Sequence, residues 1–326
     1  MTDNMLCASI RIRMARNLRG YPFPARITDK KQFSEITEKV EAALCDKTDM
    51  QLTKISSLSP IERRRLVERH VISPELSKNE YGALIHTPDY KISVMINEED
   101  HIRIQAVCEG FDIKRALMAA KEVDNMLSEE LMIAYDDEFG YLTACPTNVG
   151  TAMRISAMLH LPALEATGNI SEVVGSLNRM GYVVRGVYGE GSEAIGGFYQ
   201  ISNEITLGLT CEEIADDFKK VCEKVCAAEQ KARSMIYESD KTGVEDKLMR
   251  SLGTLKYCRK LSSLEAVKML SDVCLAVSLG IINGDVNELY SAFWEIMPAC
   301  ISKETDRAID RDIRRAKYIN DLLREV

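Results

Sequence analysis

Two arginines share one face of the first β-like segment of the chain. Residues 9–14 read Ser-Ile-Arg-Ile-Arg-Met, and in an extended strand this alternation places Ser9, Arg11 and Arg13 on the same side. Neighbouring guanidinium groups repel each other unless an anion lies between them, and their planar, paired N–H donors fit phosphate oxygens. The face therefore indicates a phosphate site, although an edge strand with a solvated charged face would show the same pattern.

Arginines on three later segments are candidates for the same site. These residues are Arg103, Arg154 and Arg185, and the sequence does not show whether they converge with the first pair. The Gly-rich loop over residues 189–197 matches a dinucleotide fingerprint only loosely, because a β-like run follows it where a helix is needed. The sequence has no Walker lysine loop either, so a bound nucleotide would have its phosphates held by arginines.

Acidic residues occur at two places where chemistry is conceivable. Glu98, Glu99 and Asp100 occupy the turn of a predicted hairpin. A carboxylate there could be the base that removes a proton from a nucleophile, or the three acids could form a polar hairpin tip. Glu190 lies in the Gly-rich loop and is open to the same two interpretations.

The cysteines and histidines give weaker signals. Cys145 precedes a predicted helix start, a position that favours a reactive thiolate. The other nine cysteines are scattered through a long chain without a secretory signal, which indicates reduced thiols, and Cys222 with Cys226 fits helix packing better than metal binding. The four histidines lack the spacing of a zinc site, so we predict no protein metal-ligand set.

The periodicity of the chain predicts strands mixed with helices, followed by helices alone. Helices are expected over 30–46, 59–70, 112–130 and 170–180, with one more after 145–148 that carries Arg154 and Met158. Strands are expected over 9–14, 90–96, 102–107, 183–188 and 198–207. After Thr210 the pattern is helical, with breaks near Gly243, residues 280–284 and Pro298. The change from mixed to helical structure falls near residues 230–240.

The composition is that of a folded, acidic protein. The 326 residues include 46% hydrophobic and 28% charged residues, and 42 basic against 50 acidic residues give a net charge of −8. The acidic excess lies before residue 231, which argues against direct nucleic-acid binding over a general surface. The sequence contains neither a membrane-spanning apolar run nor a secretory signal, so we expect a cytoplasmic protein.

Several segments together resemble the phosphagen (guanidino) kinase family, and within it the bacterial branch that acts on arginine in proteins. The matching segments are residues 9–13 with 15–17, 97–103, 145–151, 154–158 with 160–164, and 185–193. Cys-Pro-Thr-Asn-x-Gly-Thr at 145–151 is specific to guanidino kinases. The segment Arg-Gly-x-Tyr-Gly-Glu-Gly-Ser-Glu at 185–193 and the run at 311–316 point to the protein-directed branch. The resemblance covers essentially the whole chain.

The resemblance implies an α+β fold with a mainly antiparallel sheet flanked by helices over residues 1–230, and an all-helical regulatory and dimerisation domain over 231–326. It implies transfer of the γ-phosphoryl group of ATP to arginine side chains of proteins, with Mg²⁺ held mainly through the nucleotide phosphates. The implied partners are arginine-bearing protein substrates, an activator protein, a Clp-type unfoldase in a stress response and a second copy of the chain.

Site residues also follow from the resemblance. Glu99 and Glu190 would hold the substrate guanidinium, with Glu99 as the base, and Cys145 would lie beside the guanidinium and tune its orientation. The implied ATP-binding residues are Ser9, Ile10, Arg11, Ile12, Arg13, His70, Arg103, Arg154, Ile155, Ser156, Ala157, Met158, Arg185, Gly186, Val187, Tyr188, Gly189 and Glu190. The implied allosteric phosphoarginine site is Arg311, Asp312, Ile313, Arg314, Arg315 and Ala316.

Departures from the family pattern leave alternatives open. We expect a shortened leading segment and no large amino-terminal helical domain, which favours an open site able to take a protein arginine. Ile10 stands where a small hydroxyl residue is usual, and Ala152-Met153 replaces a more Gly-like pair. The alternatives are a kinase of a free guanidino metabolite, an inactive pseudokinase and a non-catalytic phosphoarginine-binding adaptor.

Overall fold

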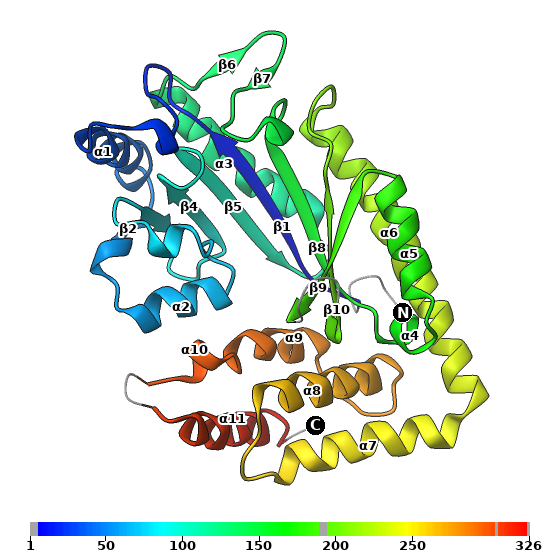
Figure 1. The fold of residues 1–326 in the computed structure, drawn as a ribbon. Coiled ribbons are helices and arrows are strands. Elements are labelled where there is room, and N and C mark those ends of the chain that lie inside the picture. The colour runs from blue at the N-terminus through cyan, green and yellow to red at the C-terminus, as the bar shows by residue number, and fades with distance from the viewer. Residues whose placement is uncertain (1–5, 189–193, 304–305, 325–326) are drawn as a thin grey trace.

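An eight-stranded antiparallel sheet occupies the middle of the structure (Figure 1). The coordinates are a computed structural model that describes residues 6–188, 194–303 and 306–324. The order across the sheet is β2-β3-β4-β5-β1-β8-β10-β9. In chain order, its strands are β1 (Cys7–Arg16), β2 (Gln51–Lys54), β3 (Ala83–His86), β4 (Ile92–Ile96), β5 (Ile102–Glu109), β8 (Met153–His160), β9 (Tyr182–Tyr188) and β10 (Ala194–Asn203). A separate small hairpin joins β6 (Tyr135–Asp136) and β7 (Gly140–Tyr141).

Strand β1 lies near the centre of the sheet and has the predicted two-sided character. Ile10 and Ile12 are fully buried on one face, while Arg11 and Arg13 lie on the other. The strand pairs with β5 on one side and with β8 on the other, and Arg13 stands opposite Arg154 in the second pairing. The alternation of the sequence therefore separates a core face from a charged face.

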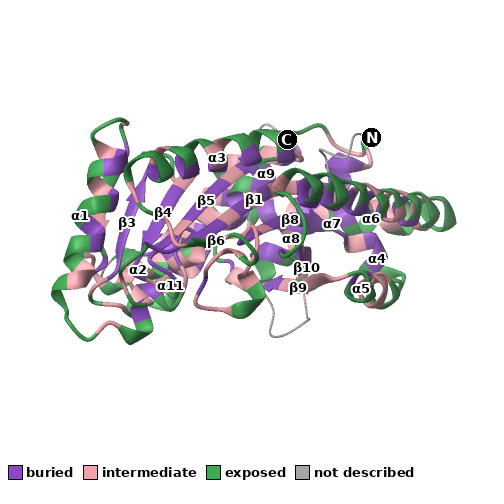
Figure 2. Ribbon diagram, turned by 90° about the horizontal axis from the view of Figure 1, so that it is seen from above, coloured by how far each residue is buried: buried purple, intermediate pink, exposed green. Residues whose placement is uncertain are grey.

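Helices α1 (Lys31–Cys45), α3 (Ile113–Glu130) and α6 (Cys211–Ser239) cover the core face of the sheet. Their apolar stripes and the inward residues of the strands form the main hydrophobic cluster, and the outer faces of the helices are exposed (Figure 2). Two shorter helices, α4 (Pro162–Ala166) and α5 (Ile170–Arg179), lie between β8 and β9 in the chain. The predicted helices over 30–46, 112–130 and 170–180 are thus confirmed.

Two groups of residues pack on the opposite face of the sheet. Helix α2 (Pro60–Glu68) lies within the predicted 59–70 and begins with Ser59 as N-cap and Pro60 in the first turn, and its neighbourhood packs on Leu84 and Met95. On the other side the carboxyl-terminal helices pack on residues such as Met158. The cleft described below is lined by the strands of this face and by residues that follow α2, and a smaller cavity beside it reaches the carboxyl-terminal helices.

The carboxyl-terminal helices form their own hydrophobic cluster beneath the sheet in Figure 1. They are α7 (Lys241–Tyr257), α8 (Ser263–Ser278), α9 (Val286–Glu295), α10 (Pro298–Ile301) and α11 (Ala308–Leu322). Helix α6 runs unbroken through residue 230, and the break comes at Asp240, whose side chain accepts a hydrogen bond from the Gly243 N–H in the first turn of α7. Among the described residues, we find no helix with the length and apolar character needed to cross a membrane.

One element differs in type from the prediction. Arg154 and Met158 lie on strand β8, so the helix predicted for them is wrong. The same residues fit a helical spacing, but their apolar neighbours at 153, 155, 157 and 159 alternate and are buried, and β1 and β10 pair with the segment on both sides. Strand β10 also begins and ends four residues earlier than the predicted 198–207.

Candidate active site

A cleft of about 880 Å³ lies on the face of the sheet opposite α1, α3 and α6. All five candidate arginines line it, and they come from four different strands. These residues are Arg11, Arg13, Arg103, Arg154 and Arg185. The convergence that the sequence left undecided is therefore present in the folded chain.

The guanidinium groups of this cluster are crowded and lack enough negative charge to balance them. Burial, followed by the charges of Arg154 and Arg103, lowers the pKa of Arg11 to about 10. Burial and the neighbouring Arg11 hold the pKa of Arg13 well below its ordinary value, and the Nε of Arg13 is buried without a hydrogen-bond partner. Excess positive charge and a buried unpaired donor are what an oligophosphate anion would compensate, so the cluster fits the phosphates of ATP.

The acidic turn at 97–100 places two carboxylates at the edge of this cluster. Arg103 pairs with both, at 2.7 Å from Oε2 of Glu98 and 3.1 Å from Oε2 of Glu99. The Glu98 side chain is 5% exposed and the Glu99 side chain is 47% exposed. Glu98 is therefore a buried partner of Arg103, whereas Glu99 is the carboxylate that an incoming substrate can reach.

The next residue, Asp100, holds the turn in place. It is fully buried, and its Oδ1 accepts hydrogen bonds of 2.7 Å from the Asn17 side chain and of 2.7 Å from the backbone N–H of Ala144. These bonds connect three segments that are distant in the chain. The turn is thus a cross-linked corner anchored by the buried Asp100, with Glu99 as its exposed residue, a distinction from a fully solvated hairpin tip that the acidic pattern alone could not make.

Cys145 follows Ala144 and is half-buried. The helical segment that follows it is a single 3₁₀ turn (Pro146–Asn148), and strand β8 comes next. The Sγ atom of Cys145 lies 3.1 Å from the Thr147 hydroxyl. Among the described residues that line the 880 Å³ cleft, Cys145 does not occur, and its connection to Glu99 runs through the Ala144–Asp100 hydrogen bond. Its role beside a substrate guanidinium stays a prediction.

The implied ATP-binding residues divide between the two faces of the sheet. Side chains on the open face line cavities, namely those of Ser9, Arg11, Arg13, His70, Arg103, Arg154, Ser156, Met158 and Arg185. Side chains on the core face are buried away from the cleft, namely those of Ile10, Ile12, Ile155 and Ala157. Val187 packs in the carboxyl-terminal cluster, and Gly186 pairs with Tyr199 in β10. Tyr188 is the last residue of β9, while Gly189 and Glu190 lie outside the described residues.

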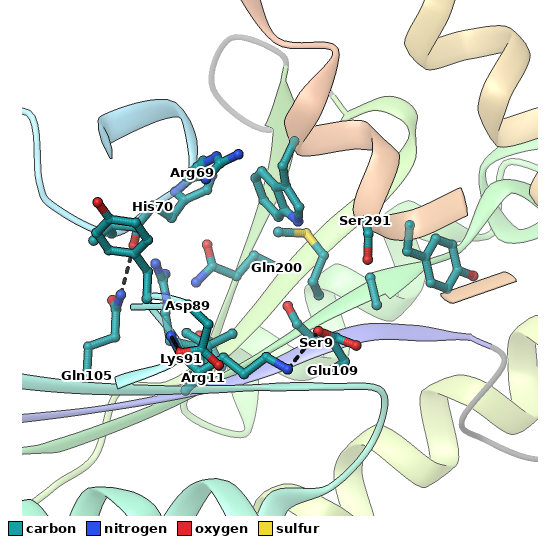
Figure 3. A pocket seen from close by; sticks show the side chains of 18 of the residues that line it. Ser9, Arg11, Arg69, His70, Asp89, Lys91, Gln105, Glu109, Gln200 and Ser291 are labelled. Carbon is teal, nitrogen blue, oxygen red and sulfur yellow. Dashed lines mark hydrogen bonds and ion pairs between the residues drawn. The ribbon is translucent and has the colours of Figure 1, made fainter. Parts of the chain in front are cut away.

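A second cavity of about 270 Å³ adjoins the cleft and shares Arg11, His70, Gln105 and Gln200 with it (Figure 3). Gln105 donates a 2.9 Å hydrogen bond to the backbone carbonyl of His70, which has a left-handed backbone with φ of 54°. Burial, then the charges of Arg11 and Arg13, lowers the pKa of His70 to about 3, so the ring is neutral at physiological pH.

Gln105 and Gln200 were not identified as site residues from the sequence, although the strand alternation around each one indicated its direction. Gln105 stands two residues after Arg103 on β5, and Gln200 stands two residues before Ser202 on β10. Residues two apart in a strand share a face. Each therefore faces the cleft together with a neighbour that lines it.

The run at 311–316 lies on α11 and contains two kinds of residue. Arg315 is 1% exposed, donates hydrogen bonds of 2.7 Å to the carbonyls of Leu261 and Ile296, and pairs with Asp312 at 2.6 Å. Ala316 is also buried. These two residues are therefore part of the packing between α11 and its neighbours.

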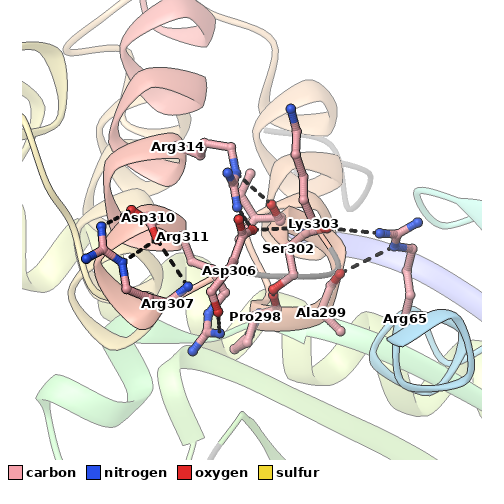
Figure 4. A network of polar contacts seen from close by, with 11 residues as sticks. Arg65, Pro298, Ala299, Ser302, Lys303, Asp306, Arg307, Asp310, Arg311 and Arg314 are labelled. Carbon is pink, nitrogen blue, oxygen red and sulfur yellow. Dashed lines mark hydrogen bonds and ion pairs between the residues drawn. The ribbon is translucent and has the colours of Figure 1, made fainter. Parts of the chain in front are cut away.

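The remaining arginines of the run are more accessible. Arg314 forms an ion pair with Asp306, and Arg311 donates a long hydrogen bond of 3.5 Å to the Asp306 carbonyl (Figure 4). Ile313 is half exposed. Arg314 also donates a 3.1 Å hydrogen bond to the Ile301 carbonyl, but its side chain is 30% exposed, so a ligand could reach Arg311 and Arg314, whereas Arg315 is buried.

Two family models match the chain. Residues 32–232 match the ATP:guanido phosphotransferase C-terminal catalytic domain, and residues 241–326 match the Protein-arginine kinase McsB C-terminal domain. The chain belongs to the ATP:guanido phosphotransferase family. The first match contains β2 to β10 with most of the cleft, and the second contains the carboxyl-terminal helices.

Curated relatives agree over nearly the full length. The chain is 41% identical to a protein-arginine kinase of Bacillus velezensis and 41% identical to one of Bacillus subtilis, each over 98% of this chain and 91% of the relative. It is 37% identical to a protein-arginine kinase of Caldanaerobacter subterraneus over 98% of both chains.

Solved structures show the same fold. Lombricine kinase superposes with a TM-score of 0.63 at 23% identity, over 71% of this chain and 68% of that one. The duplicated taurocyamine kinase of Schistosoma mansoni, with bound transition-state analogue components, superposes with a TM-score of 0.63 at 25% identity, over 82% of this chain and 40% of that one. The predicted family, its protein-arginine kinase branch and the α+β guanidino kinase fold are therefore confirmed.

Proposed function

We propose that this chain transfers the γ-phosphoryl group of ATP to arginine side chains of proteins. The observation that carries the proposal is the convergence of five arginines on one cleft that has Glu99 at its edge. The near-full-length similarity to proteins named protein-arginine kinase supports the choice of acceptor.

The arginine cluster is proposed to bind and neutralise the nucleotide phosphates. Bidentate guanidinium donors from four strands would surround the triphosphate and stabilise the charge that spreads over the transferring group. Mg²⁺ would be held mainly through the phosphate oxygens and would contribute further positive charge there. No group of three or more His, Cys, Asp or Glu side chains in the described parts of the chain is placed to bind a metal ion directly.

Glu99 is proposed to activate the acceptor. An arginine guanidinium has a pKa far above physiological pH, so its nitrogen is a poor nucleophile until a proton is removed. The carboxylate of Glu99 would take that proton as the nitrogen–phosphorus bond forms and the bond between the γ-phosphorus and the bridging oxygen breaks to release ADP. Glu190 is proposed as the second carboxylate that orients the guanidinium, and Cys145 as a neighbour that tunes its angle.

The regulatory part of the proposal concerns the carboxyl-terminal helices. We propose that Arg311 and Arg314, together with Asp312, bind phosphoarginine and that this binding adjusts activity. An activator protein, a Clp-type unfoldase, a stress-response setting, a homodimer and a cytoplasmic location belong to the same proposal. The ion pair of Arg314 with the Asp306 side chain and the hydrogen bond of Arg311 to the Asp306 carbonyl are contacts that a phosphoarginine ligand would have to replace.

The test is incubation of the full chain with Mg-ATP and an arginine-rich unfolded protein. The products are read by mass spectrometry under conditions that preserve the acid-labile phosphorus–nitrogen bond, with free arginine in a parallel reaction. Phosphoarginine on the protein and not on the free amino acid is the expected result. Transfer to free arginine alone would reassign the chain as a metabolite kinase, and ATP binding without any transfer, even with activator present, would leave the adaptor interpretation.

A further inference from the structure

The 270 Å³ cavity beside the arginine cleft is built from both halves of the chain. One side comes from the segment that matches the catalytic-domain model, with Tyr90 on a turn and Met158 on β8. The other side comes from helix α9, which contributes Ser291, Trp294 and Glu295 and belongs to the segment that matches the carboxyl-terminal model. The cavity is therefore incomplete without the carboxyl-terminal helices.

The walls of this cavity suit a flat, aromatic ligand. Trp294 lies edge-to-face with the ring of His70, with ring centroids 5.0 Å apart and an angle of 83° between the planes. Tyr90 and Met158 add further apolar surface to the lining. Aromatic walls with a few polar groups are typical of small-molecule sites, and aromatic side chains stack favourably on flat rings.

The position of the cavity relates it to the nucleotide. It shares Arg11 and His70 with the cleft in which the arginines would bind phosphates. A molecule with a triphosphate on the arginine cluster and a base attached through a sugar would extend its base into this adjoining space. The base would then meet the neutral ring of His70 and the wall made by α9.

We propose that helix α9 of the carboxyl-terminal segment forms one wall of the nucleobase subsite, with Trp294 in contact with the base. This inference rests on the proposed use of ATP. It makes the carboxyl-terminal helices part of the nucleotide site, so that any change in their placement changes nucleotide affinity. Trp294 is thereby a nucleotide-positioning residue that the catalytic-domain segment does not contain.

A network of polar contacts fixes this wall relative to His70. The residues just before His70 bind the carboxyl-terminal helices: Arg69 pairs with Glu295 at 2.5 Å, and Glu68 accepts a 2.6 Å hydrogen bond from the Ala299 N–H. Arg69 directly precedes His70, and Glu295 directly follows Trp294. The Arg69–Glu295 ion pair therefore joins the segment that carries the His70 ring to the helix that carries Trp294. These contacts set the relative positions of the two rings, and Arg69 and Glu295 themselves line the cavity.

The chain contains a single tryptophan, so its intrinsic fluorescence reports on Trp294 alone. We would titrate the full chain with Mg-ATP and, separately, with tripolyphosphate, which fits the arginine cluster but has no base. Mg-ATP should change the Trp294 emission saturably and protect it from acrylamide quenching. Tripolyphosphate should compete with ATP in calorimetry yet leave both fluorescence signals unchanged.

Two variants sharpen the test. Trp294→Leu should weaken ATP binding about tenfold in calorimetry and leave tripolyphosphate affinity unchanged. Tyr257→Ala is the matched control, because Tyr257 is a 79% exposed aromatic residue of the same helical segment and is not among the residues lining the cavity. It should bind ATP like the unaltered chain.

The outcomes separate this inference from the proposed function. If the unaltered chain binds ATP in calorimetry but its tryptophan signal matches that with tripolyphosphate, the base does not contact α9 and the inference is wrong. If calorimetry shows no ATP binding, the proposed function itself fails. Since the fluorescence arm uses the unaltered chain, a folding defect in Trp294→Leu would not obscure the result.

Discussion

The Nη2 atom of Arg103 lies 3.1 Å from Oε2 of Glu99, so the candidate phosphate site and the candidate base are joined by an ion pair. Arg103 also lines the cleft with four other arginines. Removal of a proton from the acceptor and stabilisation of the transferring phosphoryl group would therefore take place on adjacent side chains. This arrangement makes the contribution of the carboxylate separable from that of the cation by substitution.

Glu99→Gln should lower the rate of phosphoryl transfer by about 10²- to 10⁴-fold while ATP affinity changes little. The amide keeps a similar shape and an oxygen for Arg103 but cannot accept the proton of the acceptor. Single-turnover transfer and calorimetric ATP binding would be measured on the same preparation. Unaltered turnover would remove Glu99 as the base.

The neighbouring Glu98→Gln substitution is the matched control. Glu98 is buried and pairs with Arg103 at 2.7 Å, so its loss should disturb the placement of Arg103 and weaken ATP binding. The two variants should thus differ in which quantity they change. Equal loss of binding in both would mean that Glu99 acts only through Arg103.

Arg13→Gln should weaken ATP binding about 10- to 100-fold and at the same time raise the thermal stability of the ligand-free chain. Arg13 is crowded by Arg11, Arg103 and Arg154, so the free protein loses a repulsion while the nucleotide loses a charge-assisted donor. Melting curves with and without ATP would measure both effects. Arg179→Gln, at an exposed position of α5, should change neither quantity, and lower ligand-free stability of Arg13→Gln would contradict the prediction.

The charged face of β1 could be predicted because a period of two is a local property of the sequence. The site itself could not, because its members come from strands joined by backbone pairing between distant segments, such as the register that sets Arg13 opposite Arg154. The same limit explains why a helix was predicted where the structure has strand β8. The spacing of the residues in this segment fits both the period of a helix and the period of a strand, and the pairing with β1 and β10 selects the strand. Trp294 gave no signal at all, since its part in the cavity depends on the packing of the carboxyl-terminal helices.

Arg315→Ala should destabilise the chain by about 3 kcal/mol, because it leaves the buried carbonyls of Leu261 and Ile296 without a donor. Arg311→Ala should change stability by no more than about 0.5 kcal/mol and should alter activation or assembly more than basal transfer. Urea unfolding would give the first comparison, and transfer with and without phosphoarginine the second. Collapse of single-turnover transfer in a folded Arg311→Ala protein would exclude a purely regulatory role.

A pH-dependent loss of stability should originate at His160. The residue is fully buried, bonds to the Ser271 hydroxyl at 2.7 Å and lies 3.3 Å from a guanidinium nitrogen of Arg233. Burial, and then the charge of Arg233, holds the pKa of this imidazole well below its usual range. The folded chain therefore keeps a neutral ring, whereas the unfolded chain takes up a proton below about pH 6.5.

The sign follows from which state binds the proton. Since only the unfolded state is protonated as pH falls below about 6.5, the contribution is present above that pH and about 1.4 kcal/mol of it is lost by pH 5.5. His160→Asn should be less stable at pH 7.5, and its deficit relative to the unaltered chain should shrink by about that amount at pH 5.5. Ser271→Ala keeps the imidazole and should retain the original slope. Other buried titrating groups such as Glu229 are common to all three proteins, so parallel pH profiles for His160→Asn and the unaltered chain would show that His160 is protonated equally in both states.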